Sequence, residues 1–330
     1  MKVDLQKIHK ILIIQYQPFG DVLLNTGYLP ALRKKFPDAK IDYLVKSKYK
    51  IILENNPYLD EIVDFEDGKG LHYIPERIRL LRRIRKSNYD LVIDQIRGTG
   101  SAQMTLFSGA RYRLGFKHQK YAFLYNIKAE RESIRYYSSM KFDTLKPLGI
   151  EEEAHKLYFY VRPESEQYIN HWIKSSSLQN QKLICISPGS PVKKKKWNLH
   201  SYAKLGDLIL ENTESKVIVL WAPNEKPDAD QLFNLMKHKP IMAPPTDLSQ
   251  AAALLKKSSL LICNDGGLNH LSVATETPSI AMFGIIKPTR WSAVIFEGHY
   301  HFFNEKHDSS EDDTFGIDPQ DVYKKVMEIS

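Results

Sequence analysis

An aspartate stands at the start of a predicted helix, where a nucleotide-binding protein usually places a phosphate. The segment 11–16 predicts a buried strand, and a short loop containing Gly20 leads to a helix over 21–35 that opens at Asp21. The G-x-G-x-x-G of a dinucleotide site is absent from this loop, which disfavours an oxidoreductase. A carboxylate repels phosphate but can accept a proton, and the helix start favours its ionised form.

Four consecutive lysines follow another predicted strand, "LICIS", in the second half of the chain. In the segment "SPGSPVKKKKW", Ser190 offers a hydroxyl group and Lys193–Lys196 offer four cations before Trp197. A flexible cationic loop at the carboxyl end of a strand suits an anionic ligand such as a diphosphate. A solvated basic loop is the plain alternative, and the charges alone do not decide between the two.

Acidic residues stand at the end of the next strand, in the segment "WAPNEKPDAD". Glu225 can accept hydrogen bonds from a hydroxyl group of a ribose or a sugar. Asp228 and Asp230 spell D-x-D, a pattern associated with metal-held nucleotide sugars. We interpret this pair instead as acids in the first turn of a helix, where they complement the helix dipole, and we predict no metal site.

A third strand, "LLICN", leads to an aspartate and two glycines. Asp265 stands at the tip of the strand, and Gly266-Gly267 precede a helix that opens near Leu268. Glycines let backbone N–H groups approach a ligand closely, and a helix N-terminus favours an anion. Asp265 can bind a sugar hydroxyl, and His270 can reach a phosphate group bound at the start of this helix. The alternative is an ordinary helix cap with a packed histidine, since one Gly-Gly pair is weak evidence.

The first half of the chain contains two basic segments. The predicted helix "ERIRLLRRIRKSNY" contains Arg77 and five further cations with one acid, and "RYRLGFKHQK" contains Arg113 and three further cations. These clusters, with a net charge of +8, indicate an acidic partner such as a phosphorylated lipid, an acidic sugar or a membrane surface. Nucleic acid fits least, because no recognised binding motif is present. A solvated helix face is the plain alternative.

Alternating strands and helices must position all these loops. The alternation weakens over 150–180 and then restarts, which predicts two doubly wound parallel-sheet domains, 1–165 and 166–330. Ligands of such sheets bind outside the carboxyl ends of the strands. The acidic segment 308–313 predicts a solvated loop, and the closing helix over 318–329 is a candidate to pack back on the first domain.

The cysteine content and the apolar runs indicate a compartment. Cys185 and Cys263 lie in apolar runs and form neither a disulfide framework nor a metal-binding spacing. The first residues lack the apolar segment and cleavage site of a signal peptide, and no run approaches the roughly 18 apolar residues of a membrane span. We therefore expect a cytoplasmic protein in a reducing compartment.

Several of these motifs, taken in order, resemble glycosyltransferase family 9, the ADP-heptose–lipopolysaccharide heptosyltransferases. In the first half the resemblance lies in Gly20-Asp21, "LPALRKKFPDA", "NNPYLDEIVDF", "YDLVIDQ" and "LFSGARYRLGF". In the second half it lies in "SPGSPVKKKKW", "NEKPDA", "NDGGLNHLSVATETPSIAMFG" and the "RW" at 290–291. Separated motifs in the right order are more specific than any one of them, and they cover nearly the whole chain.

The resemblance implies the GT-B fold, in which two Rossmann-like domains face a central cleft. The N-terminal domain would bind the acceptor and the C-terminal domain the nucleotide-sugar donor. The implied reaction is an inverting transfer of a heptose or related sugar from ADP-heptose to an acidic saccharide of the lipopolysaccharide core, without a cofactor or an essential metal. A lipid-linked acceptor implies peripheral contact with the inner face of the cytoplasmic membrane.

The roles of the family carry over to single residues of this chain. Asp21 matches the catalytic base, and Lys195 matches the phosphate-binding lysine two positions before the tryptophan, although a neighbouring lysine could substitute. Glu225 and Asp265 match the residues that bind sugar or ribose hydroxyls. The other donor-side positions are Ser190, Gly266, Gly267 and His270, and the acceptor-side candidates are Phe19, Gly20, Arg77 and Arg113.

Two residues depart from the pattern of the family. Gly266 stands where a hydroxyl residue is usual, so one phosphate hydrogen bond is lost or comes from the backbone alone. Gln15 stands where an arginine is common. Either departure allows a different donor or acceptor. A nucleotide-sugar binding protein without transferase activity is the alternative function, which Asp21 and the four lysines disfavour.

Overall fold

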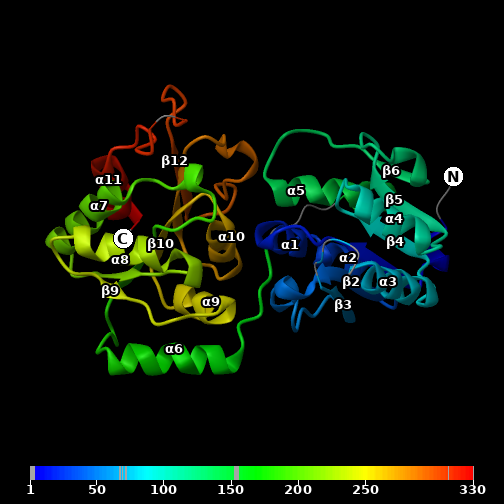
Figure 1. Ribbon diagram of the computed structural model, residues 1–330, viewed down its shortest axis with the longest axis horizontal. Helices are drawn as coiled ribbons and strands as arrows, with labels where there is room; N and C mark the ends of the chain where they lie inside the picture. Colours follow the sequence, from blue (N-terminus) through cyan, green and yellow to red (C-terminus); the bar gives the residue numbers. More distant parts are fainter. Residues whose placement is uncertain are drawn as a thin grey trace. The chain divides into compact units, whose positions relative to one another are not determined.

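The computed structural model describes residues 4–329 apart from 67, 69, 71, 72, 152–155 and 311. The chain divides into two compact units, Met1–Tyr160 and Val161–Ser330 (Figure 1). The boundary therefore precedes helix α6 (Pro163–Ser175), whereas the sequence prediction placed it after residue 165, inside this helix.

The first unit contains a six-stranded parallel sheet in the order β3-β2-β1-β4-β5-β6. Its strands are β1 (Lys10–Ile14), β2 (Lys40–Lys46), β3 (Glu61–Phe65), β4 (Leu91–Asp94), β5 (Tyr112–Phe116) and β6 (Ile127–Ala129). Its helices are α1 (Phe19–Thr26), α2 (Leu29–Lys35), α3 (Ile74–Lys86), α4 (Thr99–Phe107) and α5 (Tyr137–Phe142). This is the Rossmann strand order, which reverses between β1 and β4.

The second unit repeats this order in the sheet β12-β11-β10-β7-β8-β9, again with parallel strands. Its strands are β7 (Leu183–Ser187), β8 (Lys216–Val219), β9 (Ile241–Met242), β10 (Leu260–Asn264), β11 (Ser279–Phe283) and β12 (His299–Phe303). Its helices are α6, α7 (Leu199–Asn212), α8 (Lys226–Leu235), α9 (Leu248–Lys256), α10 (Gly267–Ala274) and α11 (Pro319–Ile329). The order reverses between β7 and β10.

The central strands are apolar except at their ends, because helices cover both faces of a parallel sheet. Residues 11–14 of β1 are completely buried, and every residue of β7 is buried. The closing helix α11 packs against α7, and its Val322 and Val326 lie in the core of the second unit. The predicted class, two doubly wound α/β domains, is confirmed.

One predicted helix differs from the structure. The helix predicted over 21–35 is divided into α1 and α2. Pro30 stands in the first turn of α2, where its missing N–H group is tolerated, whereas inside a continuous helix it would remove a hydrogen bond. The segment after β2 forms a short 3₁₀ helix over Ser47–Ile52.

Candidate active site

The residues predicted to do chemistry gather where the two strand orders reverse. In the first unit, the loop after β1 leads to Asp21 in the first turn of α1. In the second unit, the lysine loop (residues 188–198) follows β7 and Asp265 follows β10. Because β7 and β10 are neighbouring parallel strands, these two loops start at the same edge of the sheet. Ligands of open parallel sheets bind at such reversal points.

The carboxylate of Asp21 is partly buried and is open in the sense that no described residue donates a hydrogen bond to it. The backbone N–H group of Asp21 donates to the carbonyl of Pro18 at 2.9 Å, at the start of α1. No group in the described part of the chain donates a hydrogen bond to the carboxylate itself. Burial raises the pKa of Asp21, and the charge of Lys141 opposes this shift. An open carboxylate of raised basicity is suited to accept a proton.

The loop before Asp21 is shaped by the buried side chain of Gln15. Its Oε1 accepts a hydrogen bond from the N–H group of Gln17 at 3.0 Å, so the side chain turns the loop. Phe19 and Gly20 lie partly buried in the first turn of α1, beside Asp21. Gln15, which stands where an arginine is common in the family, therefore affects the path of this loop. The acceptor-side roles of Phe19 and Gly20 stay predictions.

The two arginines predicted on the acceptor side are held by backbone carbonyl groups. Arg77 donates to the carbonyl of Gly100 at 2.7 Å, which connects α3 to the start of α4. Arg113 donates to the carbonyls of Ala110 and Leu124, both at 2.9 Å, beside β5. These contacts give both arginines a structural role, and their contact with an acceptor stays a prediction.

A buried cation acts on Asp21, and two further cations act on that cation; none of the three was predicted at this site from the sequence. Lys141 of α5 is completely buried, and its charge acts on Asp21. Burial lowers the pKa of Lys141 to about 8, and the charges of Arg131 and Arg97 contribute to this shift. Arg97 follows β4 and Arg131 follows β6, so both stand after the carboxyl ends of strands. No local motif marks these residues, because each is distant from Asp21 in the sequence.

Lys195 and Asp265, predicted from separate loops, form an ion pair in the second unit. The Nζ of Lys195 lies 2.6 Å from Oδ2 of Asp265, with side-chain exposures of 25% and 5%. Burial raises the pKa of Asp265, and the bond to Lys195 opposes this shift. The pair holds the ammonium group at the tip of β10, beside the first turn of α10, where an anion would be favoured.

Asn264, the last residue of β10, joins the two loops of the second unit. Its Oδ1 accepts hydrogen bonds from the backbone N–H of Trp197 at 2.9 Å and from the hydroxyl of Tyr202 at 3.0 Å. Its Nδ2 donates to the carbonyls of Pro188 and Gly189 at 2.8 and 3.1 Å. Asn264 thus fixes both ends of the lysine loop against β10. An asparagine that ends a buried apolar strand was the available sequence signal for this role.

His270 is buried in the first turn of α10. Burial, with a smaller contribution from the charge of Lys195, lowers the pKa of His270 to about 3. The ring centre lies 6.3 Å from that of Trp291. At neutral pH the imidazole is therefore uncharged, so it can offer a ligand a hydrogen bond but no positive charge.

Two glycines of the second unit differ in the space around them. A Cβ atom on Gly189 would lie 2.4 Å from Oε2 of Glu225, so the close packing of Glu225 requires a glycine there. Burial also raises the pKa of Glu225. A Cβ atom on Gly266 would meet nothing closer than the carbonyl of Asn264 at 3.8 Å, and the backbone there is extended. Packing therefore does not impose the glycine at 266, and a hydroxyl side chain would fit.

Comparison with known proteins agrees with this arrangement. Residues 77–309, more than half of the chain, match the sequence profile of glycosyltransferase family 9 (heptosyltransferase). The chain belongs to glycosyltransferase family 9. It is therefore a glycosyltransferase, and the interpretation as a dinucleotide oxidoreductase is excluded.

Relatives of this glycosyltransferase are similar over most of their length. Lipopolysaccharide heptosyltransferase 1 of Campylobacter coli is 26% identical, over 97% of this chain and 98% of that protein. Lipooligosaccharide heptosyltransferase 2 of Haemophilus influenzae is 23% identical, over 84% of each chain. A family 9 glycosyltransferase from Veillonella parvula has a similar structure, with a TM-score of 0.86, 21% identity, and coverage of 100% of this chain and 98% of that one.

A second solved structure relates the fold to a named enzyme. Escherichia coli heptosyltransferase WaaC, solved with ADP-2-deoxy-2-fluoro heptose, matches with a TM-score of 0.75, at 18% identity. The match covers 97% of this chain and 100% of that one. The predicted GT-B fold is thereby confirmed.

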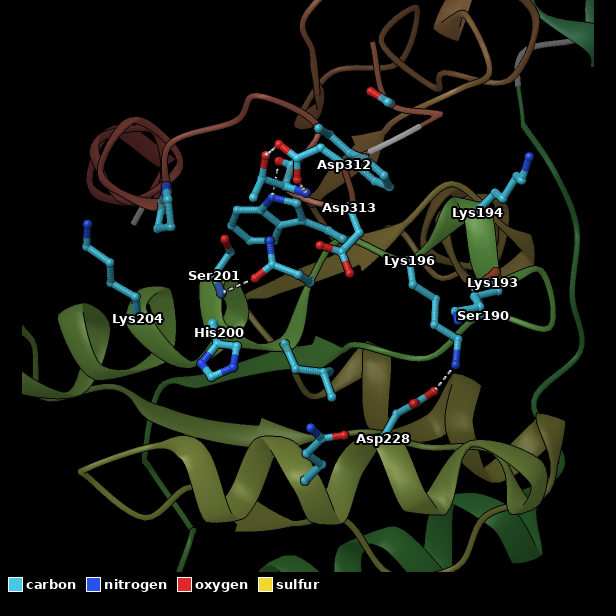
Figure 2. Close-up of a pocket in the computed structure, with 18 of the residues that line it drawn as sticks. Ser190, Lys193, Lys194, Lys196, His200, Ser201, Lys204, Asp228, Asp312 and Asp313 are labelled. Atoms are coloured by element: carbon cyan, nitrogen blue, oxygen red, sulfur yellow. Dashed lines mark hydrogen bonds and ion pairs between the residues drawn. The ribbon is translucent and has the colours of Figure 1, made fainter. Parts of the chain in front are cut away.

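The four lysines of the glycosyltransferase have different surroundings. Lys195 contacts Asp265, whereas Lys196 forms an ion pair with Asp228 of α8. Lys193, Lys194 and Lys196 line a depression of about 1370 Å³ beside the start of α7 (Figure 2). Lys195 is not among the residues that line this depression. Of the four, Lys195 is therefore the one that stands at the end of β10, as the family pattern implies.

The described residues of the acidic segment 308–313 form a loop that is exposed or partly exposed, as predicted, and its end also contacts the lysine loop. The carbonyl of Asp313 accepts a hydrogen bond from Asn198 N–H at 3.0 Å, and the carbonyl of Thr314 accepts one from the Trp197 indole at 2.8 Å. Side chains of this segment line the same depression, although Glu311 lies outside the described residues. The segment thus supports the loop that carries Lys195.

The remaining polar candidates have local partners. Asp228, in the first turn of α8, pairs with Lys196, and Asp230 pairs with Lys226. The interpretation of the D-x-D as acids in the first turn of a helix holds for Asp228, whereas Asp230 is the fifth residue of α8 and lies beyond the first turn. The buried hydroxyl of Ser190 accepts a hydrogen bond from the N–H group of Val192 at 3.3 Å, so it turns the lysine loop.

Proposed function

We propose that this enzyme transfers heptose, or a closely related sugar, from ADP-heptose to an acidic saccharide of the lipopolysaccharide core. The transfer is a single inverting displacement without an essential metal. Relatives of the chain are heptosyltransferases, and one structure of similar fold was solved with an ADP-heptose analogue. The observation that carries the proposal is the combination of the open carboxylate of Asp21 with the Lys195–Asp265 pair, each at the reversal point of its sheet.

Asp21 serves as the general base of this displacement. The acceptor hydroxyl gives its proton to the carboxylate while its oxygen bonds to the anomeric carbon of the donor. The bond from that carbon to the diphosphate oxygen breaks on the opposite side, so the configuration inverts and ADP leaves. Lys195 and the N–H groups of Gly266 and Gly267 stabilise the negative charge that grows on the leaving diphosphate.

Neutral hydroxyl groups of the donor are bound by carboxylates. Glu225 and the free oxygen of Asp265 accept hydrogen bonds from the ribose or the sugar, and His270 offers a neutral N–H group. In the first unit, the guanidinium groups of Arg97 and Arg131 suit acidic groups of the acceptor, because arginine binds carboxylate and phosphate in a fixed geometry. In this proposal the second unit holds the donor and the first unit holds the acceptor.

A thermal-shift screen with ADP-, UDP-, GDP- and CDP-sugars tests the donor. We expect ADP-heptose to stabilise most, because a ligand at a hundred times its Kd stabilises by about 2.7 kcal/mol. That is a rise of roughly 5 °C or more in Tm for a unit of this size. A larger shift with another nucleotide would contradict the donor assignment. Transfer to a lipopolysaccharide-core acceptor is then assayed directly, and binding without transfer would favour the nucleotide-sugar binding protein.

We propose further that the outer face of α3 contacts the acidic inner surface of the membrane, where a lipid-linked acceptor would be found. Arg82, Lys86 and Ile78 lie on this face, and Ile78 is 42% exposed. In the described part of the chain neither Arg82 nor Lys86 has an acidic partner. Among the described residues, no helix combines the length and the apolar character that crossing a bilayer requires.

Vesicle sedimentation tests this contact. The double variant Arg82→Glu/Lys86→Glu should bind vesicles containing phosphatidylglycerol about tenfold or more weakly than the parent protein, since each basic residue near an anionic surface contributes about 1 kcal/mol. The variant Lys174→Glu/Lys182→Glu makes the same charge change at exposed lysines of the second unit and should bind normally. Equal loss of vesicle binding in both double variants would show that the net charge of the protein matters and that the outer face of α3 does not contact the membrane specifically.

A further inference from the structure

A buried ammonium group lies near Asp21. The side chain of Lys141 is completely buried. Its Nζ donates to the carbonyl of Gln95 at 2.9 Å and lies 4.8 Å from the ring centre of Tyr137. The described part of the chain gives this ammonium group no other hydrogen-bond acceptor. A buried cation with three donors and one acceptor is costly, and it persists where a negative charge compensates it.

The ammonium group lies at the reversal point of the first sheet. Gln95 follows β4, and its N–H group donates to the carbonyl of Ile14, the last residue of β1, at 3.0 Å. From Ile14 the chain leads directly into the loop before Asp21. Helix α5, which carries Lys141, packs against α1, which carries Asp21, and the Ser138 hydroxyl donates to the carbonyl of Leu24 at 2.8 Å.

Two carboxylates act on Lys141, and they differ in their own partners. Asp94 accepts hydrogen bonds from the hydroxyl of Tyr125 at 2.5 Å and from Ile96 N–H at 2.8 Å, and burial raises the pKa of Asp94 to about 7. Asp21 has the larger effect on Lys141, and its carboxylate accepts no hydrogen bond in the described part of the chain. Asp21 is therefore the carboxylate that depends on Lys141.

The remaining charges around the pair do not replace Lys141. Arg97 and Arg131 act on Lys141 as like charges. Tyr137 of α5 and Tyr43 of β2 are the titratable neighbours on which the charge of Asp21 acts, and burial raises the pKa of both phenols, so they are neutral at physiological pH. Among the described residues, Lys141 is the cation whose charge acts directly on Asp21.

We infer that Lys141 is a positioning residue that keeps Asp21 ionised and therefore ready to take the proton of the acceptor hydroxyl. The inference rests on the proposed role of Asp21 as base. Burial alone makes the carboxylate more basic but also favours its neutral form. The buried ammonium group offsets that effect, so the base is both more basic than an exposed aspartate and charged at neutral pH.

The pH dependence of kcat/KM for transfer tests the inference. Lys141→Met removes the positive charge, so the pKa of Asp21 rises. The acid limb of the pH profile, where kcat/KM falls because Asp21 becomes protonated, should therefore move to higher pH by about one unit or more. Lys141→Arg keeps the positive charge, so its acid limb should lie close to that of the parent enzyme. Ser138→Ala removes an α5–α1 hydrogen bond without changing any charge, so it should lower the Tm and leave the limb unmoved.

A second measurement does not need a Lys141 variant that folds. In protein labelled with ¹³C at the lysine Cε, the titration of Lys141 should move to lower pH in Asp21→Asn, because coupling between two groups is reciprocal. An unmoved acid limb in Lys141→Met, or an unmoved Lys141 titration in Asp21→Asn, overturns the inference. Full transfer by Asp21→Asn would instead show that the proposed base is wrong.

Discussion

Asp21→Asn is expected to lower the kcat of sugar transfer by about 10²–10⁴-fold and to leave donor binding unchanged. The amide has the size of the carboxylate but cannot take the proton of the acceptor. Because the carboxylate accepts no hydrogen bond in the described part of the chain, the substitution breaks none. It removes one charge from the first turn of α1, which costs about 0.3–1 kcal/mol. It also takes from the buried Lys141 the carboxylate that acts on it most strongly, so a further loss of stability is expected and the Tm is measured alongside.

Steady-state transfer assays and isothermal titration with ADP-heptose measure these two effects separately. Glu76→Gln is the matched control, because Glu76 is also an acid in the first turn of a helix, α3, but lies away from the reversal point. It should transfer at the rate of the parent enzyme. Unchanged transfer by Asp21→Asn would place the base elsewhere, and loss of donor binding would give Asp21 a structural role.

Asp21 could be proposed as the base from the sequence because its position depends on local features. An apolar run that is buried on both faces predicts a central strand, and the chain leaves that strand at the edge where ligands bind. The same reasoning found Asp265 at the end of β10. The doubly wound class followed from the alternation of strands and helices, which both units repeat.

The residues that were missed act across long separations in the chain. Asn264 contacts Pro188, 76 positions earlier, and no local pattern announces such a bond. Lys141 lies in the short helix α5, where nothing in "YSSMKF" indicates that a lysine is buried. Arg77 was chosen for its charge, but a long guanidinium side chain can instead satisfy a distant carbonyl group, as it does at Gly100. Tertiary packing decides all three.

Lys195→Ala is expected to lower the kcat of transfer by about 10²–10³-fold, the usual cost of removing one group that stabilises a developing negative charge. The substitution also weakens donor binding, because the ammonium group that Asp265 holds 2.6 Å away can no longer meet the diphosphate. Lys194→Ala is the matched control. Lys194 is exposed in the depression beside α7, where solvent screens its charge, so transfer should change less than about twofold.

A stability measurement separates chemistry from folding in this comparison. Lys195→Ala leaves the buried carboxylate of Asp265 without its partner, which costs about 1–3 kcal/mol and lowers the Tm. The double variant Lys195→Ala/Asp265→Asn removes the unpaired charge, so it should recover most of the Tm but none of the transfer activity. Recovery of both would mean that Lys195 acts only by supporting the fold. Recovery of stability alone would show that the two groups act on the donor itself. Because Asp265 is also a proposed donor contact, the single variant Asp265→Asn gives the reference rate, and a further loss in the double variant would place the ammonium group of Lys195 at the leaving diphosphate.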